Sequence, residues 1–172
     1  IKTKAEAQKF LESCRSASFT IHDISTRPLK KSPAAPFTTS TLQQEAARKL
    51  GFTVAQTMMV AQRLYESGKI TYMRTDSLRL SDEAVAAARS FAGARYGQDY
   101  LPAAPRQFKA KAGAQDAHEA IRPSNVELTP ESIKKDLTSE QFRLYKLIWS
   151  RFLASQMAAA VYDSVGIEVT SA

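Results

Sequence analysis

The sequence of 172 residues contains only one cysteine, Cys14. A disulfide within the chain and a zinc site made of four cysteines are therefore both excluded. Such sparse use of cysteine is typical of proteins from a reducing compartment.

No stretch of the sequence approaches the roughly 18 consecutive apolar residues that a membrane-spanning helix needs. We also find no signal peptide, internal repeat or low-complexity tract. These absences favour a cytoplasmic protein with no membrane partner. Because Ile1 stands inside a helix-forming stretch, we expect the chain to be a fragment excised from a longer protein.

Acidic residues are in deficit, with 17 Asp and Glu against 24 Lys and Arg, which gives a net charge of +7. This balance suits an anionic partner, and nucleic acid is the commonest one. A solvated, slightly basic surface would give the same balance, so charge alone does not decide. The hydrophobic fraction of 44% is sufficient for a buried core.

Helical patterns dominate the middle of the chain, whereas both ends are β-like. Strands at 18–24 and 161–170 are rich in branched residues and are expected to be neighbours. The fold class is therefore mainly α with flanking β (α+β), with a helical domain at 40–158 inserted between β pieces at 1–39 and 159–172. The expected helices cover 2–13, 40–50, 54–67, 81–96 and a long stretch opened by a capping box at 138–141.

The helices at 40–50 and 54–67 are joined by a short turn that contains Gly51. This arrangement is typical of a helix-turn-helix, and a strand at 70–73 would complete a winged helix. Gln62 and Arg63, with Gln56 and Thr57, would then lie on DNA. The alternative is that Met58, Met59 and Leu64 belong to the core and the polar residues face water.

Four local features complete the predicted elements. Ser40 or Thr41 is expected to cap the second helix and Ser81 the helix at 81–96. The three prolines of 27–36 predict a linker or an extended crossing between domains. A short helix is expected at 116–121, and Thr129 followed by proline predicts the start of another.

Tyr72, Arg74 and Asp76 form the first candidate site. In an extended segment alternate side chains project to the same side, so Tyr72 and Arg74 would reach one bound phosphate. An adjacent guanidinium favours the phenolate and binds phosphate bidentately. A tyrosine so placed suits a nucleophile that attacks a phosphodiester. Packing of the tyrosine and a plain turn at 74–77 are the structural alternatives.

His118 and Arg122 form the second candidate site, at 116–123. Their spacing of four places them on one face of a helical turn, where they could hold a phosphate. A zinc protease would need a second histidine at position 122, so this is not a zinc motif. The alternative is that Asp116 caps a short helix and His118 is a polar surface residue.

Taken together, five stretches resemble the type IA DNA topoisomerases, in particular the bacterial topoisomerase I branch. They occur in the family's order and at similar separations, and the resemblance covers nearly the whole chain. Two features look more like topoisomerase I than topoisomerase III. One is Met73 between Tyr72 and Arg74, and the other is the sequence Glu-Ala-Ile-Arg-Pro after His118. The matching stretches are 35–43, 57–59, 61–66, 70–77 and 117–123.

The resemblance implies that Tyr72 is the nucleophile, which cuts one DNA strand and forms a 5′-phosphotyrosyl bond. Arg74 would stabilise the phosphate, Asp76 would orient the cluster, and His118 would contact DNA with support from Arg122. Rejoining would need no ATP, and strand passage would relax negative supercoils. The implied partner is a single-stranded segment of negatively supercoiled duplex in the bacterial nucleoid.

The family's acidic Asp-x-Asp-x-Glu cluster, which holds Mg²⁺, is not found in this sequence. The resemblance therefore implies that the Mg²⁺ ligands and the gate-base domain lie elsewhere in the full-length protein. The chain would be the tyrosine-bearing helical domain with two pieces of the β-rich hinge domain. By itself it is expected to bind DNA weakly and to relax none.

Two other functions compete with this one. A winged-helix module would bind DNA without chemistry. A tyrosine recombinase would also use tyrosine and arginine, but it would attach to the 3′ phosphate and expects a His-x-x-Arg pair. His118 and Arg122 are separated by three residues rather than two, which argues against the recombinase.

Overall fold

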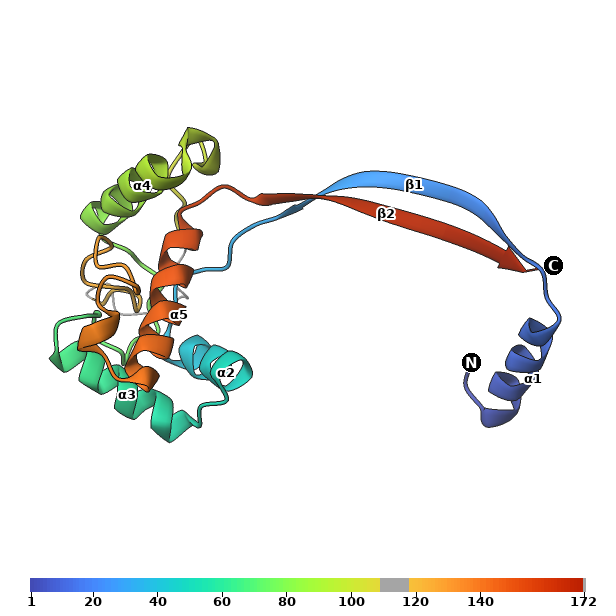
Figure 1. Ribbon diagram of the computed structural model, residues 1–172, viewed down its shortest axis with the longest axis horizontal. Helices are drawn as coiled ribbons and strands as arrows, with labels where there is room; N and C mark the ends of the chain where they lie inside the picture. The colour runs from blue at the N-terminus through green and yellow to red at the C-terminus, as the bar shows by residue number, and fades with distance from the viewer. Residues whose placement is uncertain (109–117, 172) are drawn as a thin grey trace. The chain divides into compact units, whose positions relative to one another are not determined.

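The computed structural model describes residues 1–108 and 118–171, which divide into two compact units (Figure 1). The ribbon unit comprises Ile1–Lys31 and Ala160–Ala172, and the helical unit is Ser32–Ala159. The mixture of helices with one antiparallel sheet confirms the predicted α+β class.

The ribbon unit consists of one helix and a two-stranded sheet. Thr3 caps helix α1 (Lys4–Arg15) by accepting a hydrogen bond from the backbone N–H of Glu6. Strands β1 (Phe19–Lys31) and β2 (Ala160–Ser171) pair antiparallel along their whole length, as predicted, with an irregularity between Ile21 and Asp23. None of the residues in α1 is buried, and the apolar side chains of both strands are exposed.

Strand β1 is longer than its predicted range of 18–24. For 27–36 a linker or an extended crossing was predicted, but residues 27–31 belong to β1, so the linker alternative was wrong there. Pro28 lacks a donor for the ladder but is compatible with an edge strand, and both strands of a two-stranded sheet are edge strands. Only the residues after Lys31 leave the sheet and enter the helical unit.

The helical unit is built around helix α5 (Ser139–Ser155), which contacts each of the other three α-helices (Figure 1). Those are α2 (Thr39–Leu50), α3 (Val54–Glu66) and α4 (Asp82–Tyr96). Two short 3₁₀ helices, η1 (Gln98–Tyr100) and η2 (Lys134–Asp136), lie in the connections. The predicted capping box that opens α5 is present, with Thr138 and Gln141 as its members.

The apolar stripe of α5 forms the centre of the core. Its spacing of three and four residues places these side chains on one side of the helix. Helix α4 contributes small residues at every fourth position, Ala84, Ala88 and Ala92, and all three are buried. The buried apolar side chains of α5 are Leu144, Tyr145, Ile148, Trp149, Phe152 and Leu153.

One predicted helix does not form, and another begins with a different cap. After Thr129 the chain makes a turn and then η2, so no α-helix begins at the Thr-Pro pair. Thr38, rather than Ser40 or Thr41, caps α2, and it does so in a capping box with Thr41. Gly51 ends α2 at φ 70°, a left-handed conformation that glycine adopts without strain.

Because Tyr145 is buried, the free energy of unfolding is expected to change with pH in the alkaline range. Its phenol donates a hydrogen bond to the carbonyl of Leu128 at 2.7 Å, and burial raises its pKa to about 12. An unfolded tyrosine ionises near pH 10, so the folded state retains this proton longer. The contribution is complete below about pH 10, and the free energy of unfolding is expected to fall as pH rises to about 12.

Urea titrations of the chain and of Tyr145→Phe at matched alkaline pH values test this dependence. The variant is expected to lose stability less steeply with pH, because it lacks the shifted phenol, while the lysines and the other tyrosines are common to both proteins. Equal slopes would contradict the assignment.

Candidate active site

The segment 70–77 does not form the predicted strand, and the chain bends at residues 71, 73 and 74. Ile70 makes a single bridge with Pro123, and the residues after it join no ladder. The winged-helix arrangement that required this strand is therefore not confirmed. Side-chain burial nevertheless alternates along the segment. Tyr72, Arg74 and Asp76 are exposed, whereas Met73, Thr75 and Ser77 are buried.

The ring of Tyr72 rests against helix α3. The ring centroids of Tyr65 and Tyr72 lie 5.2 Å apart with an interplanar angle of 66°, an edge-to-face geometry that aromatic pairs favour. Tyr72 remains 45% exposed. Its side chain makes no hydrogen bond within the described residues, so the phenol oxygen is accessible to a ligand.

Two threonines fix the backbone around Tyr72. The Thr71 hydroxyl donates to the carbonyl of Ala120 at 2.8 Å and accepts from the N–H of Arg122 at 3.0 Å. The Thr39 hydroxyl, at the start of α2, bonds the backbone of Met73 and Thr75. These contacts tie the tyrosine segment to α2 on one side and to the segment that follows His118 on the other.

The described part of the predicted 116–121 helix, residues 118–121, is not helical. Ile121 instead forms a bridge with Phe37, while Asp116, the expected cap, lies outside the described residues. The proposed shared helical face of His118 and Arg122 was therefore wrong. The cause is that backbone groups here pair with distant segments, as when the N–H of Ala120 donates to the carbonyl of Arg79 at 2.8 Å.

Arg122 is held by partners within the protein. Its guanidinium pairs with Glu119 at 2.7 Å and donates to the carbonyl of Pro123 at 3.0 Å. The second oxygen of Glu119 accepts from the N–H of Ser81, the cap of α4. Arg122 is thus placed to support the loop that follows His118, because Glu119 already neutralises its charge.

Unlike Arg122, three other predicted site residues have no side-chain partner among the described residues: Arg74, Asp76 and His118. All three are exposed, and within the described residues none has an ion pair or a side-chain hydrogen bond. The guanidinium of Arg74 and the imidazole of His118 are therefore available to an anionic ligand.

Helix α3 offers fewer contacts to DNA than its sequence suggested. Gln62 donates to Glu66 one turn later at 2.7 Å, whereas Arg63 is exposed. Gln56 bonds Glu140 of α5 at 2.6 Å, and Thr57 is fully buried. The expectation that Thr57 faces DNA was wrong, because its hydroxyl donates to the carbonyl of Thr53 inside the helix.

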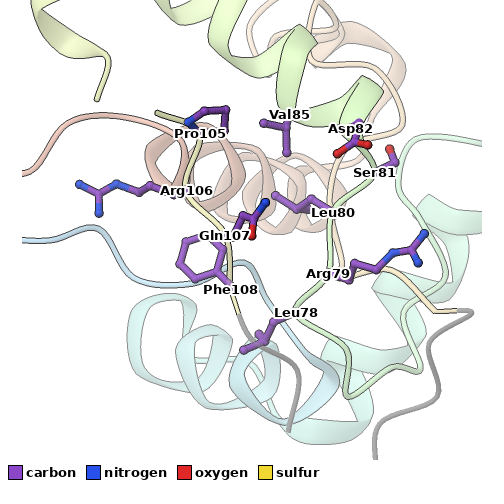
Figure 2. Close-up of a pocket in the computed structure, with 10 residues that line it drawn as sticks. All are labelled: Leu78, Arg79, Leu80, Ser81, Asp82, Val85, Pro105, Arg106, Gln107 and Phe108. Atoms are coloured by element: carbon purple, nitrogen blue, oxygen red, sulfur yellow. The ribbon is translucent and has the colours of Figure 1, made fainter. Parts of the chain in front are cut away.

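A cavity of about 460 Å³ lies between the stretches 78–82 and 105–108, beside Val85 (Figure 2). Neither Tyr72 nor Arg74 nor His118 lines it. The cavity is half open to solvent rather than enclosed, and its lining includes none of the residues of the predicted nucleophile site. The exposed side of 72–76 therefore remains the candidate site.

No group of three or more His, Cys, Asp or Glu residues that could hold a metal ion occurs in residues 1–108 and 118–171. The donors around Tyr72 thus do not fit a magnesium site made by the described residues alone. In the same ranges, no helix has both the length and the apolar character to cross a membrane.

Sequence reasoning did not single out Tyr65, Thr39 or Thr71 as parts of the site. Tyr65 lies seven residues before Tyr72, and an aromatic residue on the last turn of a helix gives no local sign of its partner. Thr39 meets its partners 34 to 36 residues away. The one signal for the two threonines was that both lie within stretches that match the family.

Comparison with known proteins shows what the chain resembles. A family model described as DNA topoisomerase matches residues 1–172. DNA topoisomerase 1 of Haemophilus influenzae is 48% identical over 170 residues, which are 99% of this chain and 20% of that protein. The structure of full-length topoisomerase I from Thermotoga maritima matches with a TM-score of 0.76 and 43% identity, over 96% of this chain and 27% of that chain. The chain thus spans about a fifth of the length of its curated relative.

Proposed function

Because the chain belongs to the bacterial type IA DNA topoisomerase family, we propose that it carries the nucleophile with which a longer enzyme cuts one strand of DNA. The observation that supports this most is that Tyr72 and Arg74, two residues apart, are both exposed, with the buried Met73 between them. Threonine contacts on both flanks hold that segment in place.

In the proposed reaction, the Tyr72 oxygen attacks the phosphorus of a phosphodiester. A bond forms between the phenol oxygen and the phosphate, which stays attached to the 5′ end. The bond to the 3′ oxygen breaks, and that oxygen leaves as a hydroxyl by taking up one proton, which balances the proton that the Tyr72 phenol loses on attack. Because one ester replaces another, the reverse attack reseals the strand without ATP.

The neighbouring residues have separate roles in this proposal. Arg74 binds the phosphate and offsets the charge that develops on its oxygens. His118 donates a hydrogen bond beside the scissile phosphate, and Asp76 orients the cluster. Arg122 supports the His118 loop through Glu119, while Gln62 and Arg63 of α3 lie along the DNA.

We assign the helical unit to the domain that carries the tyrosine, and the ribbon unit to pieces of a β-rich hinge domain. The partner is a single-stranded segment of negatively supercoiled DNA in the cytoplasm. Mg²⁺ would be held by residues outside this chain, in the metal-binding domain of the same protein. Gate-base residues outside the chain would complete the enzyme, which passes a strand and relaxes supercoils.

Labelled oligonucleotides distinguish this proposal from its competitors. When the full-length protein that contains this sequence is mixed with single-stranded DNA and Mg²⁺, a covalent adduct is expected at Tyr72. Because the protein is joined to the 5′ end of the downstream fragment, the adduct should retain a label at the 3′ end of the oligonucleotide, whereas a 5′-end label should leave with the released fragment. A 3′ linkage would indicate recombinase-like chemistry, and no adduct would indicate a winged-helix binding module. As a control, the 172-residue chain alone is expected not to relax plasmid DNA.

A further inference from the structure

The hydroxyl of Thr39 lies at the centre of the contacts around Arg74. It is 2.8 Å from the carbonyl oxygen of Met73 and 3.1 Å from that of Thr75, and it accepts the N–H of Thr75 at 2.8 Å. The N–H of Thr39 also donates to the carbonyl of Thr75 at 2.9 Å. A hydroxyl can donate once and accept as well, so one side chain satisfies both peptide groups that flank Arg74.

This arrangement fixes the backbone of Arg74 itself. A peptide group is planar, so each residue has only two free backbone rotations. The Met73 carbonyl belongs to the peptide plane before the Cα of Arg74, and the Thr75 N–H belongs to the plane after it. Because Thr39 holds both planes, it fixes both rotations at Arg74 and with them the direction of its Cα–Cβ bond.

Thr39 is itself held firmly. It is the first residue of α2, and the capping box of Thr38 and Thr41 sets the start of that helix. Met73 and Thr75, on either side of Arg74, are 1% and 8% exposed. Arg74 is thus the outward-facing residue of a clamped tripeptide, and its guanidinium has no partner within the described residues to guide it.

We propose that Thr39 is a positioning residue for strand cleavage, which acts by fixing the direction in which Arg74 meets the scissile phosphate. This proposal rests on the function proposed above. Displacing a group of a reacting site by about 1 Å lowers rates by up to about 100-fold. Removal of the Thr39 hydroxyl is therefore expected to slow cleavage by about 10- to 100-fold.

The test uses the full-length protein and a single-turnover assay of covalent adduct formation. Thr39→Val is expected to show this loss, and Thr39→Ser, which keeps the hydroxyl, is expected to restore most of the rate. Thr138→Val is the matched control, because it removes a threonine cap from α5 and is expected to leave the rate unchanged. Should Thr39→Val not fold, Thr39→Cys, with its weaker hydrogen bonds, is expected to give an intermediate loss.

A double-mutant cycle with Arg74→Ala separates positioning from a general structural effect. If Thr39 acts through Arg74, Thr39→Val is expected to slow the Arg74→Ala protein no further. A wild-type rate for both Thr39→Val and Thr39→Cys, or equal losses with and without Arg74, would overturn the proposal. Loss of the adduct in Tyr72→Phe shows that the proposed function stands even if Thr39 proves to be irrelevant.

Discussion

Full-length protein carrying Tyr72→Phe is expected to form covalent DNA adduct at least about 10⁴-fold more slowly, the scale of loss that follows removal of an enzyme's nucleophile. The substitution removes one oxygen from a ring that is 45% exposed and makes no hydrogen bond through its side chain within the described residues. The fold should therefore be unaffected. Gel separation of protein bound to end-labelled oligonucleotide measures the rate.

Tyr65→Phe is the matched control for Tyr72→Phe. Tyr65 belongs to the same aromatic pair and is similarly exposed at 41%, and the substitution keeps the ring that packs on Tyr72. Its adduct formation is expected to stay close to the wild-type rate. Unchanged adduct yield in Tyr72→Phe would instead favour a binding module in which another residue, or none, does chemistry.

The second large effect is expected for stability. Phe37→Ala should lower the free energy of unfolding of the helical unit by about 3–5 kcal/mol, the usual cost of emptying a buried aromatic site. Phe37 is fully buried. The guanidinium of Arg151 lies 4.3 Å from its ring centroid, and that cation–π contact would also be lost.

Urea unfolding followed by tryptophan fluorescence measures this loss. The chain has one tryptophan, Trp149, which is buried in α5, so its emission reports the helical unit. Phe19→Ala is the matched control because Phe19 lies in the ribbon unit and is 56% exposed. A loss below about 1 kcal/mol for Phe37→Ala would show that the core collapses around the vacated site.

Long periodic segments were predictable because their signals are local. Helices α2 to α5 combine an apolar stripe with a side-chain cap or a terminal glycine, and those features act within four or five residues. The pairing of the two end strands was also predictable, since they were the two long β-like segments of the sequence. The family resemblance located the tyrosine motif for the same reason, because its residues are contiguous.

The errors fall where distant backbone partners decide the structure. Ile70 and Ile121 each make one bridge, to Pro123 and Phe37, and neither bridge extends into a strand or leaves room for a helix. At Thr129 the Thr-Pro pair predicted a helix, but the chain makes a turn there instead. Such backbone contacts join residues that are tens of positions apart. A pattern within a few residues therefore cannot predict them.

The distance in sequence between Thr39 and residues 73–75 also explains why the role of Thr39 beside Arg74 could not be predicted. The helix was predicted to begin at residue 40, whereas Thr39 is the first residue of α2. Its hydrogen bonds to residues 73–75 depend on the course of that backbone, which is set by the burial of Met73 and Thr75.

Lys31 and Ala160 are paired at the end of the two-stranded sheet, although the entire helical unit lies between them in sequence. Closing a chain loop carries an entropy cost that rises with the logarithm of its length, and contacts between remote residues form slowly. Once the intervening residues have folded, however, their two ends are already brought together. We therefore expect the helical unit to fold first and the two strands to pair afterwards, starting from Lys31 and Ala160.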